Sequence, residues 1–115
     1  MDEQVKPITI HDEERGMDYT LEFNRESVKF AEERGFTMQD LGARSMIRLP
    51  ELFYYAFRMH HPTISRQRTD QILFEELGGM PEGMAERLGT LYGIPYNALV
   101  NETGKAKNSK MTVEF

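Results

Sequence analysis

The three histidines are the residues of this chain with the clearest potential for metal binding or acid–base chemistry. His60 and His61 are adjacent, and adjacent side chains on a helix project about 100° apart, so the two cannot easily share one metal ion. His11 could join them only through a long-range contact that the sequence does not specify. The chain has no cysteine and contains no GxSxG, HExxH or glycine-rich phosphate-loop motif. We therefore expect no enzyme activity, no catalytic residue, no metal and no cofactor.

Charged side chains are distributed unevenly along the chain. Arginines occupy positions 44, 48, 58, 66 and 68, with Glu51 as the single acid among them, whereas residues 70–86 carry five acids and no base. Arginines near Tyr54 and Tyr55 could contact nucleic acid. The formal net charge of -5 instead favours ion pairing between the two stretches, within one chain or between subunits. Nucleic-acid binding is thus the weaker interpretation.

The most apolar stretch runs from Leu49 to Ser65 and predicts a central helix over residues 49–60. Its apolar side chains recur at the three- and four-residue spacing of one helix face: Leu49, Leu52, Phe53, Ala56, Phe57 and His60. Pro50 is expected in the first turn, where its missing N–H costs little, and Pro62 is expected to stop the helix.

Further large side chains lie off this face, and they allow two interpretations. They could pack against a second side of the core, or they could form a surface that repacks around a protein partner, for which methionine and aromatic side chains are suited. The candidate partner-binding residues are Tyr54, Tyr55, Met59, Phe74 and Met80.

The remaining elements are predicted from periodicity and capping signals. Apolar alternation predicts a β-hairpin over residues 8–23, and Asn24 is placed to cap the helix that follows it. Gly93 is expected to end the last long helix, before a short helix around Asn97 to Val100. Helices are expected over residues 25–34, 49–60, 65–77 and 81–92. The expected fold class is α+β: a hairpin packed on four to five α-helices, in one domain of residues 1–100.

The last fifteen residues, 101–115, form a polar, lysine-containing segment that is expected to be a mobile tail. Its final five residues alternate in polarity and predict a short strand, which would pair with the N-terminal hairpin or with another chain. The alternative is that so short a window carries no signal. The candidate self-association residues are Met111, Val113 and Phe115. No stretch reaches the roughly 20 apolar residues that a membrane span needs.

Three phrases of the sequence resemble a known family. YTLEFNRESVKFAEERGF, LPELFYYAFRMHHPTISRQRTDQILFEELGG and the C-terminal KNSKMTVEF are similar to the tail assembly chaperones of siphophages and prophages of Gram-positive bacteria. The resemblance implies a protein in the cytoplasm of the bacterial host that binds the hydrophobic, helical tape-measure protein and keeps it soluble during tail assembly. It also implies homo-oligomers and no membrane. Two alternatives stay open: a structural phage protein, such as a head–tail connector or neck component, and a small DNA-binding regulator.

Overall fold

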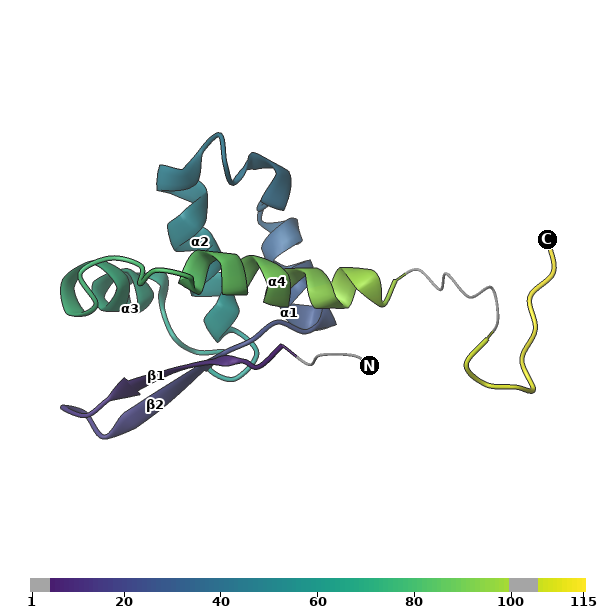
Figure 1. Cartoon of the computed structure of the whole chain (residues 1–115), viewed down its shortest axis with the longest axis horizontal. Coiled ribbons are helices and arrows are strands. Elements are labelled where there is room, and N and C mark those ends of the chain that lie inside the picture. Colours follow the sequence, from purple (N-terminus) through teal and green to yellow (C-terminus); the bar gives the residue numbers. More distant parts are fainter. Residues whose placement is uncertain (1–4, 100–105) are drawn as a thin grey trace.

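The chain begins with an antiparallel β-hairpin formed by β1 (Ile8–Asp12) and β2 (Met17–Leu21), as the sequence predicts. The structure is a computed structural model that describes residues 5–99 and 106–115. The register runs from Ile8 opposite Leu21 to Asp12 opposite Met17, and Gly16 takes a φ of 62° in the connecting turn. The hairpin lies beneath the helices (Figure 1).

The sheet contains only these two strands within the described residues. The expected third strand is not formed: residues 111–115 have no regular secondary structure and pair with neither strand of the described hairpin. The alternation in their sequence supplies strand propensity, but a strand also needs a neighbour to satisfy its backbone groups.

The first helix, α1 (Arg25–Glu33), is capped at both ends as its sequence predicts. The Asn24 side chain accepts a hydrogen bond from the Ser27 N–H at 2.8 Å, and Ser27 Oγ accepts one from the Asn24 N–H at 2.9 Å. Gly35 follows with a φ of 86°, so its N–H reaches the Glu32 carbonyl and the chain folds back. This reversal buries Phe36 against the core.

The central helix, α2 (Ser45–Phe57), starts earlier than expected, after a 3₁₀ turn, η1 (Met38–Asp40). Pro50 therefore lies inside the helix rather than in its first turn. Its missing N–H leaves the Met46 carbonyl without a helical donor, but Met46 is in the solvent-exposed first turn, where water can bind that carbonyl. The predicted core face is confirmed for Leu52, Phe53, Ala56 and Phe57, which are all fully buried.

The third helical segment covers the expected region in two parts. Ser65 caps α3 (Arg66–Asp70), and the chain continues directly as the π-helical η2 (Gln71–Glu76). Leu77 donates to the Ile72 carbonyl five residues earlier, which is the π-helical pattern. Left-handed glycines then separate this segment from the last helix.

The last helix, α4 (Met84–Asn97), differs from its expected boundaries at both ends. It begins after Gly83, not near Pro81, and it passes through Gly93 and Pro95 to Asn97. The separate short helix expected around Asn97 to Val100 is wrong at its start, since Asn97 is the last residue of α4; Val100 lies outside the described residues.

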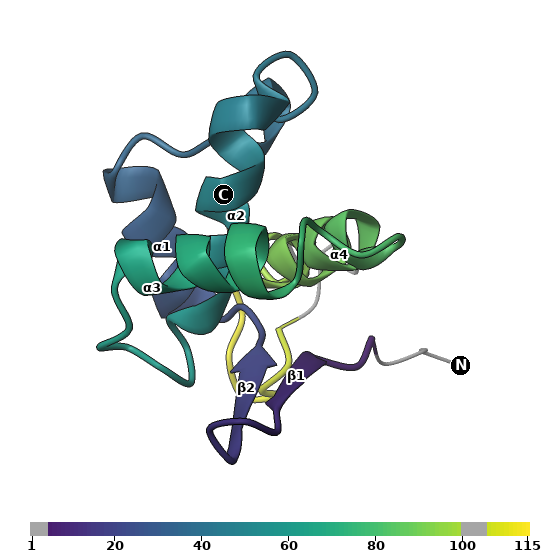
Figure 2. The ribbon, with the colours of Figure 1, turned by 90° about the vertical axis from the view of Figure 1, so that its left-hand side faces the viewer.

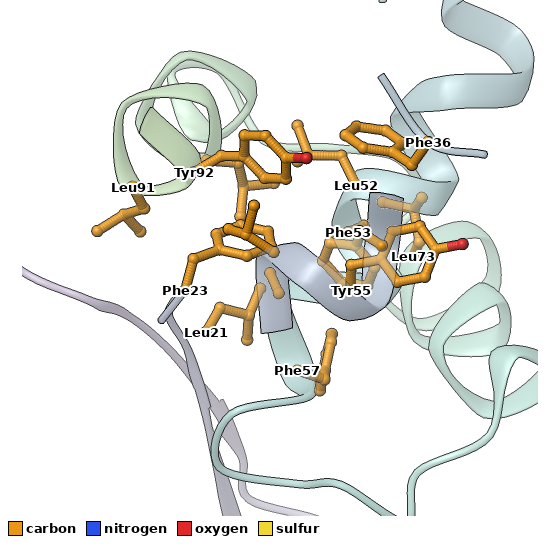
Figure 3. Close-up of a cluster of buried hydrophobic side chains, with 14 of the residues drawn as sticks. Leu21, Phe23, Phe36, Leu52, Phe53, Tyr55, Phe57, Leu73, Leu91 and Tyr92 are labelled. Carbon is orange, nitrogen blue, oxygen red and sulfur yellow. The ribbon is translucent and has the colours of Figure 1, made fainter. Parts of the chain in front are cut away.

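The core lies where β2 and the helices meet, and aromatic side chains dominate it (Figure 3). Phe36 contacts both Tyr55 and Tyr92 edge-to-face, with ring centroids 5.6 and 5.4 Å apart. Phe23 reaches Tyr92 from the end of the hairpin at 5.0 Å. Seen from the side, the hairpin extends below the layer of helices (Figure 2). The observed fold class is α+β, with a two-stranded N-terminal hairpin followed by four α-helices.

Candidate functional site

All three histidines make hydrogen bonds to strand β2 or the residue that follows it. His11 Nδ1 lies 2.8 Å from Asp18 Oδ1, and His60 Nε2 lies 2.8 Å from Glu22 Oε1. His61 Nε2 accepts the Thr20 N–H at 3.0 Å. Burial is the main cause that lowers the pKa of His61, followed by the neighbouring His60. Within the described part of the chain, no three His, Asp or Glu side chains are grouped as a metal site would need.

Most arginines of the basic stretch are engaged in ion pairs within this chain. Arg66 Nε contacts Asp70 at 2.9 Å, which is the expected pairing with the acidic stretch, whereas Arg48 contacts Asp40 and Glu51 at 3.0 and 2.8 Å. Arg44 also reaches Asp40, at 3.6 Å. The guanidinium of Arg58 instead stacks over the Phe30 ring, with its Cζ 3.8 Å from the ring centroid.

Arg68 joins the hairpin to the third helical segment. Its guanidinium pairs with Glu76, lies 3.6 Å from Asp12 and contacts the Tyr19 hydroxyl at 3.5 Å. Arg15 adds a second contact to Glu76, at 3.3 Å. The hydrogen bond from Arg68 is the main cause that lowers the pKa of Glu76. These charges are mutually compensated, so the cluster is a structural tie and not a free charged surface.

The candidate partner-binding residues do not form one exposed surface. Tyr55 is only 5% exposed and packs in the core, so of the two interpretations left open by the sequence, core packing holds for this residue. Tyr55 is buried because its ring packs edge-to-face against Phe30 of α1 and against Phe36. Tyr54 and Met80 are partly buried against the core.

Met59 and Phe74 are the exposed members of the set, and they lie in different places. Met59 lines a hollow of about 260 Å³ together with α1 side chains such as Phe30. Phe74 is 57% exposed and lines a shallow hollow along α3 and η2. Met59 and Phe74 line different hollows, so they do not form one site.

An apolar groove between α1 and α4 is the more complete candidate. A hollow of about 520 Å³ has both apolar and polar lining residues: Glu32, Phe36, Thr37, Met38, Gln39, Gly89, Tyr92, Gly93 and Tyr96. A second hollow of about 220 Å³ lies beside it, because Glu32 and Tyr96 line both. Its lining is Arg25, Val28, Lys29, Glu32, Pro95, Tyr96 and Leu99. We call these two hollows together the α1–α4 groove.

Two details describe the apolar part of the groove. Met38 packs against α4 at Gly89, where a Cβ atom would lie 3.5 Å from Cε of Met38, an ordinary van der Waals distance. Tyr96, in the last turn of α4, is 39% exposed and packs against the buried Tyr92 ring at 5.6 Å, and Leu99, just beyond the helix, is 64% exposed. The groove therefore offers large apolar side chains at its surface over a fully packed interior.

The groove is not among the sequence-based expectations, because Gly93 and Pro95 are typical of helix ends. If α4 is instead continued through them, Gly89, Gly93 and Tyr96 fall on one face at spacings of four and three residues. That periodicity is the signal that would have pointed to the groove.

No helix in the described residues is both long and apolar enough to cross a membrane. The fold and groove together define a small α+β domain with an apolar interhelical surface, a type of site suited to protein segments. The chain belongs to the family described as Domain of unknown function (DUF5055), which it matches over residues 1–115. Comparison with curated proteins and with solved structures gave no match.

Proposed function

We propose that this protein is a phage tail assembly chaperone that binds an apolar helical segment of the tape-measure protein in the α1–α4 groove. It acts without catalysis, in the cytoplasm of the bacterial host. The single observation that carries the groove assignment is the exposure of Tyr96 and Leu99 beside two adjoining hollows. The choice of client is supported by the resemblance of the quoted sequence phrases to tail assembly chaperones.

The chemistry of the groove fits an amphipathic helix better than an extended peptide. Helix-in-groove recognition places side chains spaced three, four and seven residues apart into apolar pockets. Here Tyr96 separates two such pockets, and Met38 supplies a flexible thioether that can adapt to different side chains. Arg25 and Lys29 border the second hollow and can contact acidic residues on the client's polar face.

A chaperone without nucleotide must release its client when tail-tube subunits arrive. The apolar part of the open groove gives this property, because the client exchanges one apolar contact for another at little net cost. Most of the Tyr96 surface is already buried in the free protein, which limits the additional apolar area that binding of the client can bury. Affinity is thus kept low enough for displacement.

The decisive experiment is co-expression with a siphophage tape-measure protein, followed by measurement of the soluble fraction of that protein. Tyr96→Ser combined with Leu99→Ser should lower the affinity for the client about tenfold or more. A tenfold change corresponds to about 1.4 kcal/mol, which is less than the free energy gained by burying one leucine side chain. Leu99 is largely exposed but Tyr96 also packs against Tyr92, so the melting temperature should fall by a few degrees at most and the fold should persist.

Two matched variants locate the surface. Met46→Ser removes a side chain that is exposed at the far end of α2 and should leave solubilisation intact. Met59→Ser combined with Phe74→Ser tests the two exposed residues expected from the sequence. If only the Met59/Phe74 variant loses the ability to solubilise the tape-measure protein, the client binds at those residues and not in the groove. If every variant solubilises the client fully, groove binding is refuted. A closed ring of fixed size that remains on virions would instead indicate a connector.

A further inference from the structure

The two edges of the hairpin are treated differently by the rest of the fold. In an antiparallel pair, alternate residues direct their N–H and C=O groups toward the partner strand and away from it. On β2, the outward N–H of Thr20 donates to His61 Nε2, and the N–H of Glu22, one residue beyond the strand, donates to the Ala56 carbonyl at 3.0 Å. The outer edge of β2 is therefore covered at Thr20 and at Glu22, whereas the outward N–H of Asp18 has no partner among the described residues.

The outer edge of β1 is open. Thr9 stands opposite Thr20 and His11 stands opposite Asp18, so the backbone groups of Thr9 and His11 also point away from the hairpin. Both residues are exposed, and neither N–H has a hydrogen-bond partner among residues 5–99 and 106–115. Just before β1, the Arg87 guanidinium donates a hydrogen bond to the Lys6 carbonyl at 3.2 Å, so the backbone there is covered by α4.

The same chain carries a segment of matching length and polarity. Residues 111–115 alternate between apolar and polar side chains, and β1 also has five residues. Their three apolar side chains are strongly exposed: Met111, Val113 and Phe115. The segment lies at the opposite end of the molecule from the tip of the hairpin (Figure 1).

We propose that residues 111–115 of one copy bind as a third strand on the open β1 edge of a second copy. The added strand would take up the free backbone groups of Thr9 and His11. One of its faces would place its apolar side chains beside the half-buried Ile8 and Ile10, which lie on the core-facing side of the hairpin. Its other face would place Thr112 and Glu114 beside Thr9 and His11.

This contact is heterologous, because it joins the tail of one copy to the hairpin of the next. After one contact, the pair still has one free tail and one free edge, so further contacts can extend it into a chain or close it into a ring, of which the reciprocal exchange between two copies is the smallest. The inference stands apart from the proposed client, since it uses the hairpin and the tail and no residue of the α1–α4 groove.

Two single-function variants test the contact directly. Thr9→Pro removes the outward N–H from an edge strand, where proline is tolerated, and gives a copy that can donate its tail but cannot accept one. Val113→Pro interrupts the tail strand and gives a copy that can accept but not donate. Light scattering should show oligomers that grow with concentration for the unmodified chain and monomers for each variant. An equimolar mixture of the two variants should form a complex of two chains and no larger species.

Thr9→Val keeps the N–H and the strand propensity, so it is the matched control and should oligomerise like the unmodified chain. If Thr9→Pro does not fold, hydrogen exchange gives a second test. A peptide of residues 106–115, added to a chain that lacks residues 111–115, should slow exchange of the Thr9 and His11 amides by about tenfold or more. An unmodified chain that stays monomeric would overturn the proposal, as would unchanged exchange of these two amides.

Discussion

At the scale of single residues, the Tyr92 hydroxyl is the least satisfied group of the core. The side chain is 2% exposed and packs between Phe23 and Phe36, with its oxygen directed into the apolar cluster (Figure 3). This hydroxyl has no hydrogen-bond partner within the described part of the protein. Burial raises the pKa of Tyr92 to about 12, and the carboxylate of Glu32 adds to the shift.

We expect Tyr92→Phe to stabilise the protein at about pH 8, by up to about 1 kcal/mol, because it removes a buried donor without a partner. The raised pKa adds a second effect. The neutral phenol stabilises the fold fully below the unfolded-state pKa of 10.0, and this contribution is lost as pH rises toward about 12. The unmodified chain should therefore lose about 1.4 kcal/mol more per pH unit than the variant in that window. Urea unfolding at about pH 8 and about pH 11 measures both effects; parallel losses in the two chains would contradict the assignment.

At the scale of elements, His61 acts as a cover for the outer edge of β2. It lies just beyond α2 and accepts the Thr20 N–H, a role that a neutral imidazole can fill but a protonated one cannot. Its ring also packs edge-to-face on Tyr19 and Phe57, which keeps the imidazole partly desolvated. One side chain thus joins the region after the central helix to the hairpin and covers part of its β2 edge.

Replacement of His61 should weaken this junction. His61→Ala leaves the Thr20 N–H without its partner and should cost about 1–2 kcal/mol near neutral pH. Because the folded-state pKa of His61 is lowered, the neutral ring contributes stability above pH 6.5, and that contribution is lost as pH falls through the folded-state pKa. His61→Gln offers an acceptor that does not titrate in this range, so its stability should fall less between about pH 7 and pH 5 than that of the unmodified chain. Equal losses would show that the His61–Thr20 bond is not the acid-sensitive contact.

Local signals in the sequence predicted local structure well. Asn24 and Gly35 bracket α1 because a capping side chain and a left-handed glycine act over a few residues, without help from the rest of the fold. Pro50, Gly93 and Pro95 misled the prediction of helix ends, since packing of α2 and α4 against the core outweighs local propensity there.

Residue positions in the site were harder to predict than the elements. The spacing of Tyr54 and Tyr55 places them off the main apolar face of α2, yet Tyr55 is buried because α1 and Phe36 cover that second side. Such a neighbour comes from the tertiary arrangement and has no signature in α2 itself. The α1–α4 groove likewise depends on two helices that are distant in sequence.

At the scale of the whole molecule, the hairpin is attached to the helices at its base and near its turn by different forces. Near its base, Leu21 and the adjoining Phe23 are buried in the aromatic core. Near the turn, the attachment is the polar cluster of Arg68 with Asp12, Arg15 and Glu76. The second attachment is partly solvated, so it should respond to salt and acid where the first does not.

We expect Arg68→Gln to lower the melting temperature by a few degrees and to make it less sensitive to salt. Arg68 joins two elements, whereas Arg66 pairs with Asp70 one turn away in the same helix, so Arg66→Gln is the matched control and should have a smaller effect.

Acid provides a second test. The pKa of Glu76 is lowered mainly by Arg68, so this pairing stabilises the fold above the unfolded-state value of 4.5 and the contribution is lost as pH falls. Arg68→Gln should consequently lose less stability on acidification than the unmodified chain. Thermal unfolding in about 0.05 M and about 1 M NaCl, at neutral and acidic pH, measures each effect. An equal response of the Arg66 and Arg68 variants would mean that the hairpin is held by its apolar base alone.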